Sequence, residues 1–180
     1  VKGRAYYSDA IGENQGIALS GSVQTNDGYR EHTSSDRNEI NVKHKYQGEN
    51  ESLTTSFVAS DLEQEMAAQL GAEDFANNPR SSGLTDEVLA SDPLRKSQYY
   101  RLSTTREKVT ENNYRISLIP YLRQRTNDYT ATWNANMPKQ ESEVTTLGLL
   151  SYLSFEPSAD GELIVGLDLE RSSGDSVSYQ

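Results

Sequence analysis

The sequence contains no cysteine among its 180 residues. This absence excludes disulfide bonds, metal sites built on thiolates and catalysis by a cysteine nucleophile. Long apolar runs are missing too: patches such as residues 147–150 are only a few residues long, whereas a membrane-spanning helix needs about 18 apolar residues or more. If the chain crosses a membrane, it must do so with β-strands, which contact lipid only at every second residue.

Basic residues are scarce relative to acidic ones, with 17 Lys and Arg against 27 Asp and Glu. The formal net charge of -10 and the lack of a basic stripe argue against nucleic-acid binding, which requires clustered Lys and Arg. Only 34% of the residues are hydrophobic, and the mean hydropathy is -0.77. A soluble domain of this length normally buries a larger apolar core.

Recognisable enzyme motifs are absent as well. The sequence has no G-x-S-x-G elbow, P-loop, G-x-G-x-x-G or H-E-x-x-H motif. His32 lies in a polar segment and His44 in an alternating one, so we interpret both as incidental rather than as catalytic bases or ligands. The acids of residues 63–92 lack the spacing of a calcium loop, and we interpret them as solvated. We predict no enzymatic activity, no cofactor and no metal site.

Apolar and polar residues alternate with a period of two in many segments, which is typical of β-strands with one apolar face. We predict strands over residues 1–8, 15–28, 37–47, 52–62, 97–106, 113–131, 144–155 and 162–171. A short helix is predicted within residues 61–70, where acids and alanines have fair helix propensity. The predicted fold is all-β: an antiparallel up-and-down meander of about eight strands, each paired with its sequence neighbours.

The predicted connections alternate in kind. Short polar turns are expected at residues 9–14, 48–51, 107–112 and 156–161, and longer connections at 29–36, 63–96 and 137–143. Transmembrane barrels have short periplasmic turns and longer outer loops, so the pattern favours a barrel wall. Both ends of the chain would then lie at the outer rim, as in an internal segment of a larger barrel. An interfacial girdle is predicted beside the short turns, formed by Tyr6, Tyr7, Tyr46, Tyr114 and Phe155.

The order of these segments resembles the TonB-dependent outer-membrane receptors, which import ferric siderophores, vitamin B12 and similar scarce ligands. Residues 17–30, which end in Asp27-Gly28-Tyr29-Arg30, resemble an early barrel strand of this family. Residues 113–123 resemble a mid-barrel upward strand, and residues 146–149 and 163–170 resemble a later pair.

The resemblance implies a 22-stranded transmembrane barrel in the bacterial outer membrane. Residues 1–180 would form a partial β-barrel domain of it, without the N-terminal plug or the energy-coupling box. The implied function is energy-coupled uptake of a scarce ligand such as a ferric siderophore. The implied partners are outer-membrane lipid, that ligand and a periplasmic TonB-type energy-coupling protein that acts through the plug.

Polar residues expected on the lumen side are the candidate ligand-binding residues. Inside a plugged barrel, arginines contact the plug or an anionic ligand through charge-assisted hydrogen bonds. Alternatively, they pair with lumen acids such as Asp168 and Glu170. The candidates are Arg115, Tyr121, Arg123 and, in the long loop, Arg80.

The alternation also assigns faces. Lys43 and Lys45 should point to the lumen with Arg115 and Arg123. The lipid-facing set should be Ile40, Val42, Leu53, Phe57, Ile116, Leu118, Leu122, Leu147, Leu149, Val165, Leu167 and Leu169.

Three local features lead to further predictions. Pro120 should cause a β-bulge because proline lacks an N–H to donate. Trp133 and Tyr129, close to the outer rim, could anchor the outer interface or help to form a ligand platform, and we favour the interface. The loop at residues 63–96 should be extracellular and mobile without ligand. Two alternatives stay open: a self-contained small outer-membrane barrel with a structural or adhesive role, and a secreted all-β binding module or outer-membrane enzyme.

Overall fold

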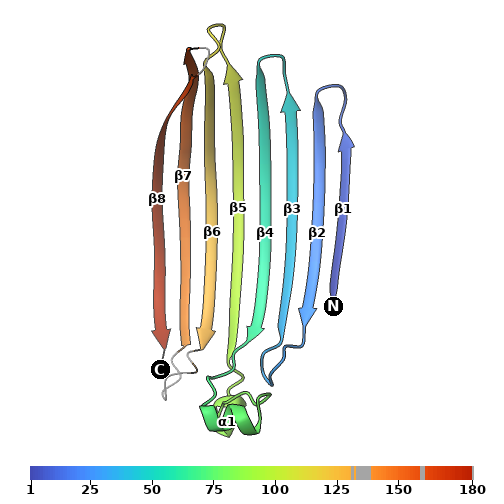
Figure 1. Cartoon of the computed structure of the whole chain (residues 1–180), viewed down its shortest axis with the longest axis vertical. Coiled ribbons are helices and arrows are strands. Elements are labelled where there is room, and N and C mark those ends of the chain that lie inside the picture. Colours follow the sequence, from blue (N-terminus) through green and yellow to red (C-terminus); the bar gives the residue numbers. More distant parts are fainter. Residues whose placement is uncertain (131, 133–138, 159–160, 180) are drawn as a thin grey trace.

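A computed structural model describes residues 1–130, 132, 139–158 and 161–179. It contains one antiparallel sheet of eight strands in sequence order, so every strand pairs with its neighbours in the chain. The strands are β1 (Lys2–Ala10), β2 (Gln15–Asn26), β3 (Ser35–Gln47), β4 (Glu51–Glu65), β5 (Leu94–Val109), β6 (Arg115–Thr130), β7 (Lys139–Ser158) and β8 (Gly161–Tyr179). Figure 1 shows a single layer with β1 and β8 at opposite edges. The predicted all-β meander is confirmed.

The predicted helix at residues 61–70 is wrong. Residues 61–65 continue β4, because they pair with residues 94–98 of β5 and the sheet overrides the local helix propensity. Two short helices form further along the same connection, α1 (Ala72–Asn77) and α2 (Asp86–Ala90). The hydroxyl of Thr85 caps α2 by accepting a hydrogen bond from the Val88 N–H at 3.4 Å. Within the described part of the chain, neither helix is long and apolar enough to cross a membrane.

Short and long connections lie at opposite ends of the sheet (Figure 1). The turns from β1 to β2, from β3 to β4 and from β5 to β6 lie at one end. The β2–β3 connection, the β4–β5 connection with its two helices and both chain ends lie at the other, which we call the loop end. This arrangement matches the predicted sorting of the connections within residues 1–130. Of the other two predicted connections, residues 139–143 and 156–158 belong to β7, while residues 137–138 and 159–160 lie outside the described residues. Trp133 lies outside the described residues. Tyr129 shares the face of Arg123, as the unbroken register of β6 with β7 shows, so the prediction that it anchors the lipid interface is wrong.

Neighbouring residues along each strand point to opposite faces of the sheet. We define the face that carries Leu122 as the outer face and the face that carries Arg123 as the inner face. The strand register places the whole predicted lipid-facing set on the outer face, and Lys43, Lys45 and Arg115 on the inner face with Arg123. The face assignment made from the alternation is therefore confirmed as a division of the sheet.

The two faces differ in exposure. Buried residues of the strands lie on the inner face, as expected when a sheet curves toward that side and crowds its side chains. They include Ser117, Tyr121, Thr146 and Ser154. Large apolar side chains of the outer face are open, with Leu147 63% exposed. The sheet therefore has no second layer packed against its apolar face within the described residues.

Pro120 does not produce the predicted bulge. The β5–β6 register is the same on both sides of it, with Ser103 opposite Tyr121 and Arg106 opposite Leu118. Pairing with β5 stops only at Pro120 and its neighbour, while Pro120 still lies opposite Leu149 on β7. The missing N–H therefore interrupts the ladder on one side without an inserted residue.

One member of the predicted aromatic girdle faces the wrong way. Tyr7 lies opposite Leu19 and shares the outer face, whereas Tyr6 lies opposite Ser20 and belongs to the inner face. A one-residue step along a strand always reverses the face, so Tyr6 cannot join a lipid-facing belt. Tyr114 and Phe155 form an edge-to-face pair with ring centroids 5.5 Å apart, in the range that aromatic pairs prefer.

Candidate functional site

A polar cluster lies at mid-height on the inner face, and we call Arg101, Tyr121, Arg123 and Glu170 the inner-face cluster. These side chains come from β5, β6 and β8. Tyr121 is the centre: it is 8% exposed, and its hydroxyl donates a hydrogen bond to Glu170. The guanidinium carbon of Arg101 lies 4.9 Å from the centre of the Tyr121 ring, and that of Arg123 lies 6.0 Å from it.

Strand register explains how these residues meet. Tyr121 lies opposite Gly148 on β7, and Gly148 lies opposite Glu170 on β8. Because Gly148 has no side chain, the tyrosine ring can lie across β7 and reach the carboxylate on the next strand. Arg101 lies opposite Arg123 in the adjacent row, which places both cations beside the ring.

Glu170 is the acidic partner of the cluster. The Arg123 guanidinium lies 3.5 Å from Glu170 Oε1 and 3.4 Å from the Thr146 hydroxyl. The Ser172 hydroxyl donates to Glu170 Oε1 at 3.2 Å. Pairing of a candidate arginine with a lumen acid, the alternative named from the sequence, is therefore present for Arg123 and Glu170.

Arg101 differs from Arg123 in its polar contacts. Its Nε atom is buried and has no hydrogen-bond partner among the described residues. A buried donor without a partner costs free energy, so it favours an acceptor brought by another segment or a ligand. A carboxylate or carbonyl oxygen at the inner face would satisfy it. Arg101 was not among the candidate ligand-binding residues predicted from the sequence.

The four predicted ligand-binding residues do not form one site. Tyr121 and Arg123 lie together, but Arg115 is exposed at the short-turn end of β6. Six residues of strand separate it from Tyr121, which is about 20 Å. Arg80 is exposed in the β4–β5 connection, where its guanidinium carbon lies 4.8 Å from the centre of the Tyr29 ring.

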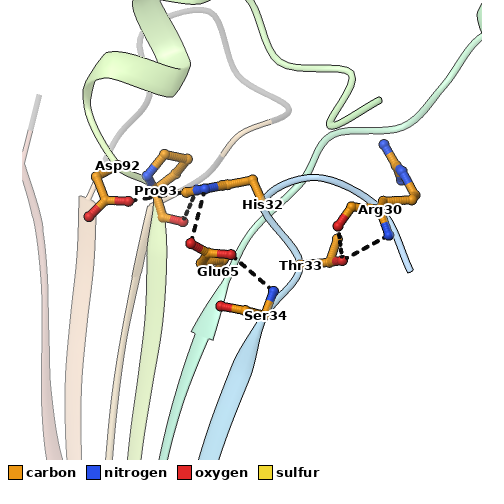
Figure 2. Close-up of polar contacts among 7 residues, drawn as sticks. All are labelled: Arg30, His32, Thr33, Ser34, Glu65, Asp92 and Pro93. Carbon is orange, nitrogen blue, oxygen red and sulfur yellow. Dashed lines mark hydrogen bonds and ion pairs between the residues drawn. The ribbon is translucent and has the colours of Figure 1, made fainter. Parts of the chain in front are cut away.

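Arg30 holds the two long connections together at the loop end. Its Nε donates to the Ser81 carbonyl at 2.8 Å, and its Nη2 donates to the carbonyls of Ala68 at 2.7 Å and Ser82 at 2.8 Å. Thr33 accepts a hydrogen bond from the Arg30 backbone N–H at 3.2 Å (Figure 2). The β4–β5 connection is thus hydrogen-bonded to the β2–β3 connection.

A second polar cluster at the loop end, which we call the His32 cluster, comprises His32, Glu65 and Asp92 (Figure 2). His32 Nδ1 lies 3.5 Å from Glu65 Oε1, and His32 Nε2 lies 3.9 Å from Asp92 Oδ1. The backbone N–H of Ser34 donates to Glu65 Oε2 at 3.0 Å and lowers the pKa of this carboxyl. Sequence reasoning missed this cluster, because its members are far apart in the chain.

Comparisons with solved structures agree on the fold. The ferric citrate transporter FecA, in its unliganded form, matches 99% of this chain with a TM-score of 0.86 and 15% identity. BauA, the ferric preacinetobactin receptor from Acinetobacter baumannii, matches with a TM-score of 0.79 and 10% identity. FpvAI, from its complex with pyocin S2, matches with a TM-score of 0.74 and 13% identity.

The match covers only part of each of those proteins. This chain spans 27% of the FecA chain, 29% of the BauA chain and 26% of the FpvAI chain. No protein-family model and no curated protein matches the sequence. The eight-stranded meander therefore has the fold of a β-barrel segment of TonB-dependent siderophore receptors, which confirms at the level of the fold the resemblance noted in the sequence.

Proposed function

We propose that this chain is a section of transmembrane barrel wall in a bacterial outer-membrane receptor that takes up a scarce ligand such as a ferric siderophore. Its role is transport rather than enzymatic catalysis. Its partners are outer-membrane lipid, the ligand and a TonB-type energy-coupling protein that acts through a plug domain. Residues 1–180 serve as a partial barrel domain within this receptor.

The observation that carries this proposal is the division of a one-layer sheet into an open apolar face and a polar face. Leu167 and Leu169 are 60% and 55% exposed on the outer face, while Asp168 between them faces inward. An apolar face of this extent is unfavourable in water and requires contact with an apolar partner. In outer-membrane barrels, lipid contacts the apolar outer face and the polar inner face lines the lumen.

The open edges of the sheet favour a large barrel over a small one. β1 and β8 do not pair with each other in the described part of the chain, and the order of strands runs from one to the other without closure. An eight-stranded barrel would pair these two strands. We therefore place further strands of the receptor beside both edges.

We assign the inner-face cluster to contacts with the plug or with an anionic ligand. Arg101 offers a buried Nε that has no hydrogen-bond partner in the described part of the chain, and the side chain of Arg123 beside it is 38% exposed. Two neighbouring guanidinium groups suit carboxylate oxygens or the negative charge of a ferric chelate. Arg80, at the loop end, is proposed as a ligand contact nearer the mouth, and Arg115 as a separate lumen contact.

Cysteine labelling of adjacent residues tests the proposed membrane location. Leu167→Cys and Asp168→Cys would be made in the full-length protein, expressed in the outer membrane, and exposed to a lipid-soluble thiol reagent. Both positions are open to solvent in the isolated sheet, so exposure alone does not separate them. We expect labelling of Leu167→Cys only. Equal labelling of both would contradict a lipid-facing outer face.

Growth under iron limitation tests the proposed uptake. A strain without the receptor should lose growth on its ferric siderophore, and the full-length gene should restore it. Arg123→Ala should reduce the rescue, while Glu170→Gln, which leaves Arg123 in place, should reduce it less. If both variants lose rescue equally and assemble poorly, Arg123 stabilises the barrel wall and has no separate role in uptake.

A further inference from the structure

The His32 cluster joins three elements at the loop end. His32 belongs to the β2–β3 connection, Glu65 ends β4, and Asp92 precedes β5. The three offer ligand atoms that all lie within 4.8 Å of one another. Figure 2 shows the imidazole of His32 between the two carboxylates, with the Pro93 carbonyl beside it.

The two ion pairs of this cluster are longer than normal hydrogen bonds and involve different ring nitrogens: His32 Nδ1 lies 3.5 Å from Glu65 Oε1, and His32 Nε2 lies 3.9 Å from Asp92 Oδ1. An imidazole gives one nitrogen to an ion, so only the first separation can be a spacing between two ligand atoms. In a tetrahedral zinc site with bonds of about 2.0–2.1 Å, neighbouring ligand atoms lie roughly 3.3–3.5 Å apart. The Glu65 spacing fits this value. The ligand atoms of all three residues lie within 4.8 Å of one another, and the exposed Asp92 side chain would have to turn toward Nδ1 to complete the set.

The surroundings of His32 resemble the support that metal-binding histidines receive. Its Nε2 lies 3.1 Å from the Pro93 carbonyl, and its side chain is 8% exposed. With the proton on Nε2, the lone pair of Nδ1 faces Glu65 Oε1. A backbone carbonyl that fixes the second ring nitrogen in this way orients the ligand.

The carboxylates are placed to complete the site. Ser34 holds Glu65 Oε2 by its backbone N–H, which leaves Oε1 directed at His32. Asp92 is 69% exposed, so it can both adjust its position and admit an ion from solvent. Imidazole nitrogens and carboxylate oxygens are both ligands that zinc and related divalent ions accept.

We propose that His32, Glu65 and Asp92 bind one divalent transition-metal ion of the Zn²⁺ class. The ion links the β2–β3 connection to both ends of the β4–β5 connection. Three protein ligands leave a fourth position for water or a further donor. The bound ion cross-links the two connections at the loop end, near the hydrogen bonds of Arg30.

Metal titration of the full-length protein in detergent tests this site without any assay of uptake. The protein would be stripped with a chelator and titrated with Zn²⁺ by calorimetry and with Co²⁺ by visible absorption. We expect His32→Ala and Asp92→Asn each to weaken binding at least about tenfold, since even loss of a group that only orients a ligand costs 10–100-fold. Four-coordinate Co²⁺ bands should appear in the parent and vanish in His32→Ala.

The other histidine of the chain provides the matched control. His44 lies on β3, where its Nε2 is 2.9 Å from Gln15 Oε1, and His44→Gln should leave binding unchanged. Heat-dependent migration on gels verifies assembly of each variant. If His32→Ala does not assemble, the test rests on Zn²⁺ binding by Asp92→Asn, whose side chain is exposed. The proposal is overturned if the parent protein does not bind Zn²⁺. It is also overturned if Asp92→Asn and His32→Ala bind Zn²⁺ as the parent does, or if the conformation of the loop changes with pH but not with Zn²⁺.

Discussion

The ring of Tyr121 on β6 lies directly over Gly148 on β7, so close that any side chain at Gly148 would collide with it. This contact allows the tyrosine hydroxyl to reach Glu170 one strand further on. The inner-face cluster therefore depends on a residue that carries no functional group. Glycine is used here for close approach of a ring to the backbone, and not for an unusual backbone angle.

Gly148→Ala should displace Tyr121, break its hydrogen bond to Glu170 and destabilise the wall. Overpacking of this kind costs about 1–3 kcal/mol. The measurement is the denaturant midpoint of the full-length barrel in lipid vesicles. Gly21→Ala is the control, because an added Cβ there would meet only the Glu39 carbonyl at 3.8 Å. Equal midpoints for the two variants would contradict the role assigned to Gly148.

Leu169→Arg should destabilise the barrel in lipid far more than Asp168→Arg. Leu169 lies on the outer face near the middle of β8, whereas Asp168 faces inward. An arginine that faces lipid costs up to roughly 2–4 kcal/mol, depending on its depth, while a lumen arginine stays hydrated. Unfolding midpoints in vesicles measure the difference. Similar costs at both positions would show that the outer face is not covered by lipid.

Arg30→Ala should loosen the β4–β5 connection without affecting the strands. The change removes three hydrogen bonds from a charged donor to the carbonyls of Ala68, Ser81 and Ser82. Hydrogen bonds to charged groups contribute about 1.5–3 kcal/mol each, so faster amide exchange is expected across residues 66–93. Arg80→Ala is the control, because its ring contact contributes only about 0.5–1 kcal/mol. Unchanged amide exchange in Arg30→Ala would show that the three hydrogen bonds of Arg30 do not stabilise the β4–β5 connection.

Deletion of residues 77–85 should reduce uptake of the ligand while the barrel still assembles. The segment contains Arg80 and runs from the last residue of α1 to the residue before α2, outside the sheet. It also includes Ser81 and Ser82, which accept hydrogen bonds from Arg30, so Arg30→Ala serves as a comparison for loosening alone. The measurements are uptake of the ferric ligand and heat-dependent migration. Uptake equal to that of the parent would indicate that the inner-face cluster, and not this segment, recognises the ligand.

The sequence predicted the strands and their faces because the side-chain period of a strand is two and needs no knowledge of partners. Leu122 and Arg123 were assigned to opposite faces from their neighbours in the chain alone, and the register agrees. Loop lengths predicted which end of the sheet carries the long connections. The ends of the strands were less predictable: β8 extends to Tyr179 through a polar segment that has no alternation of its own.

Only the tertiary structure decided which distant side chains meet. Tyr121 reaches Glu170 because two strand registers and a glycine align them, and no local pattern encodes a register between strands. His32 meets Asp92 because the β2–β3 connection folds against the start of β5. Residues 61–65 became strand because pairing with β5 satisfied their backbone groups. Local composition determined the wall and its two faces, whereas contacts between segments far apart in the chain determined both polar clusters.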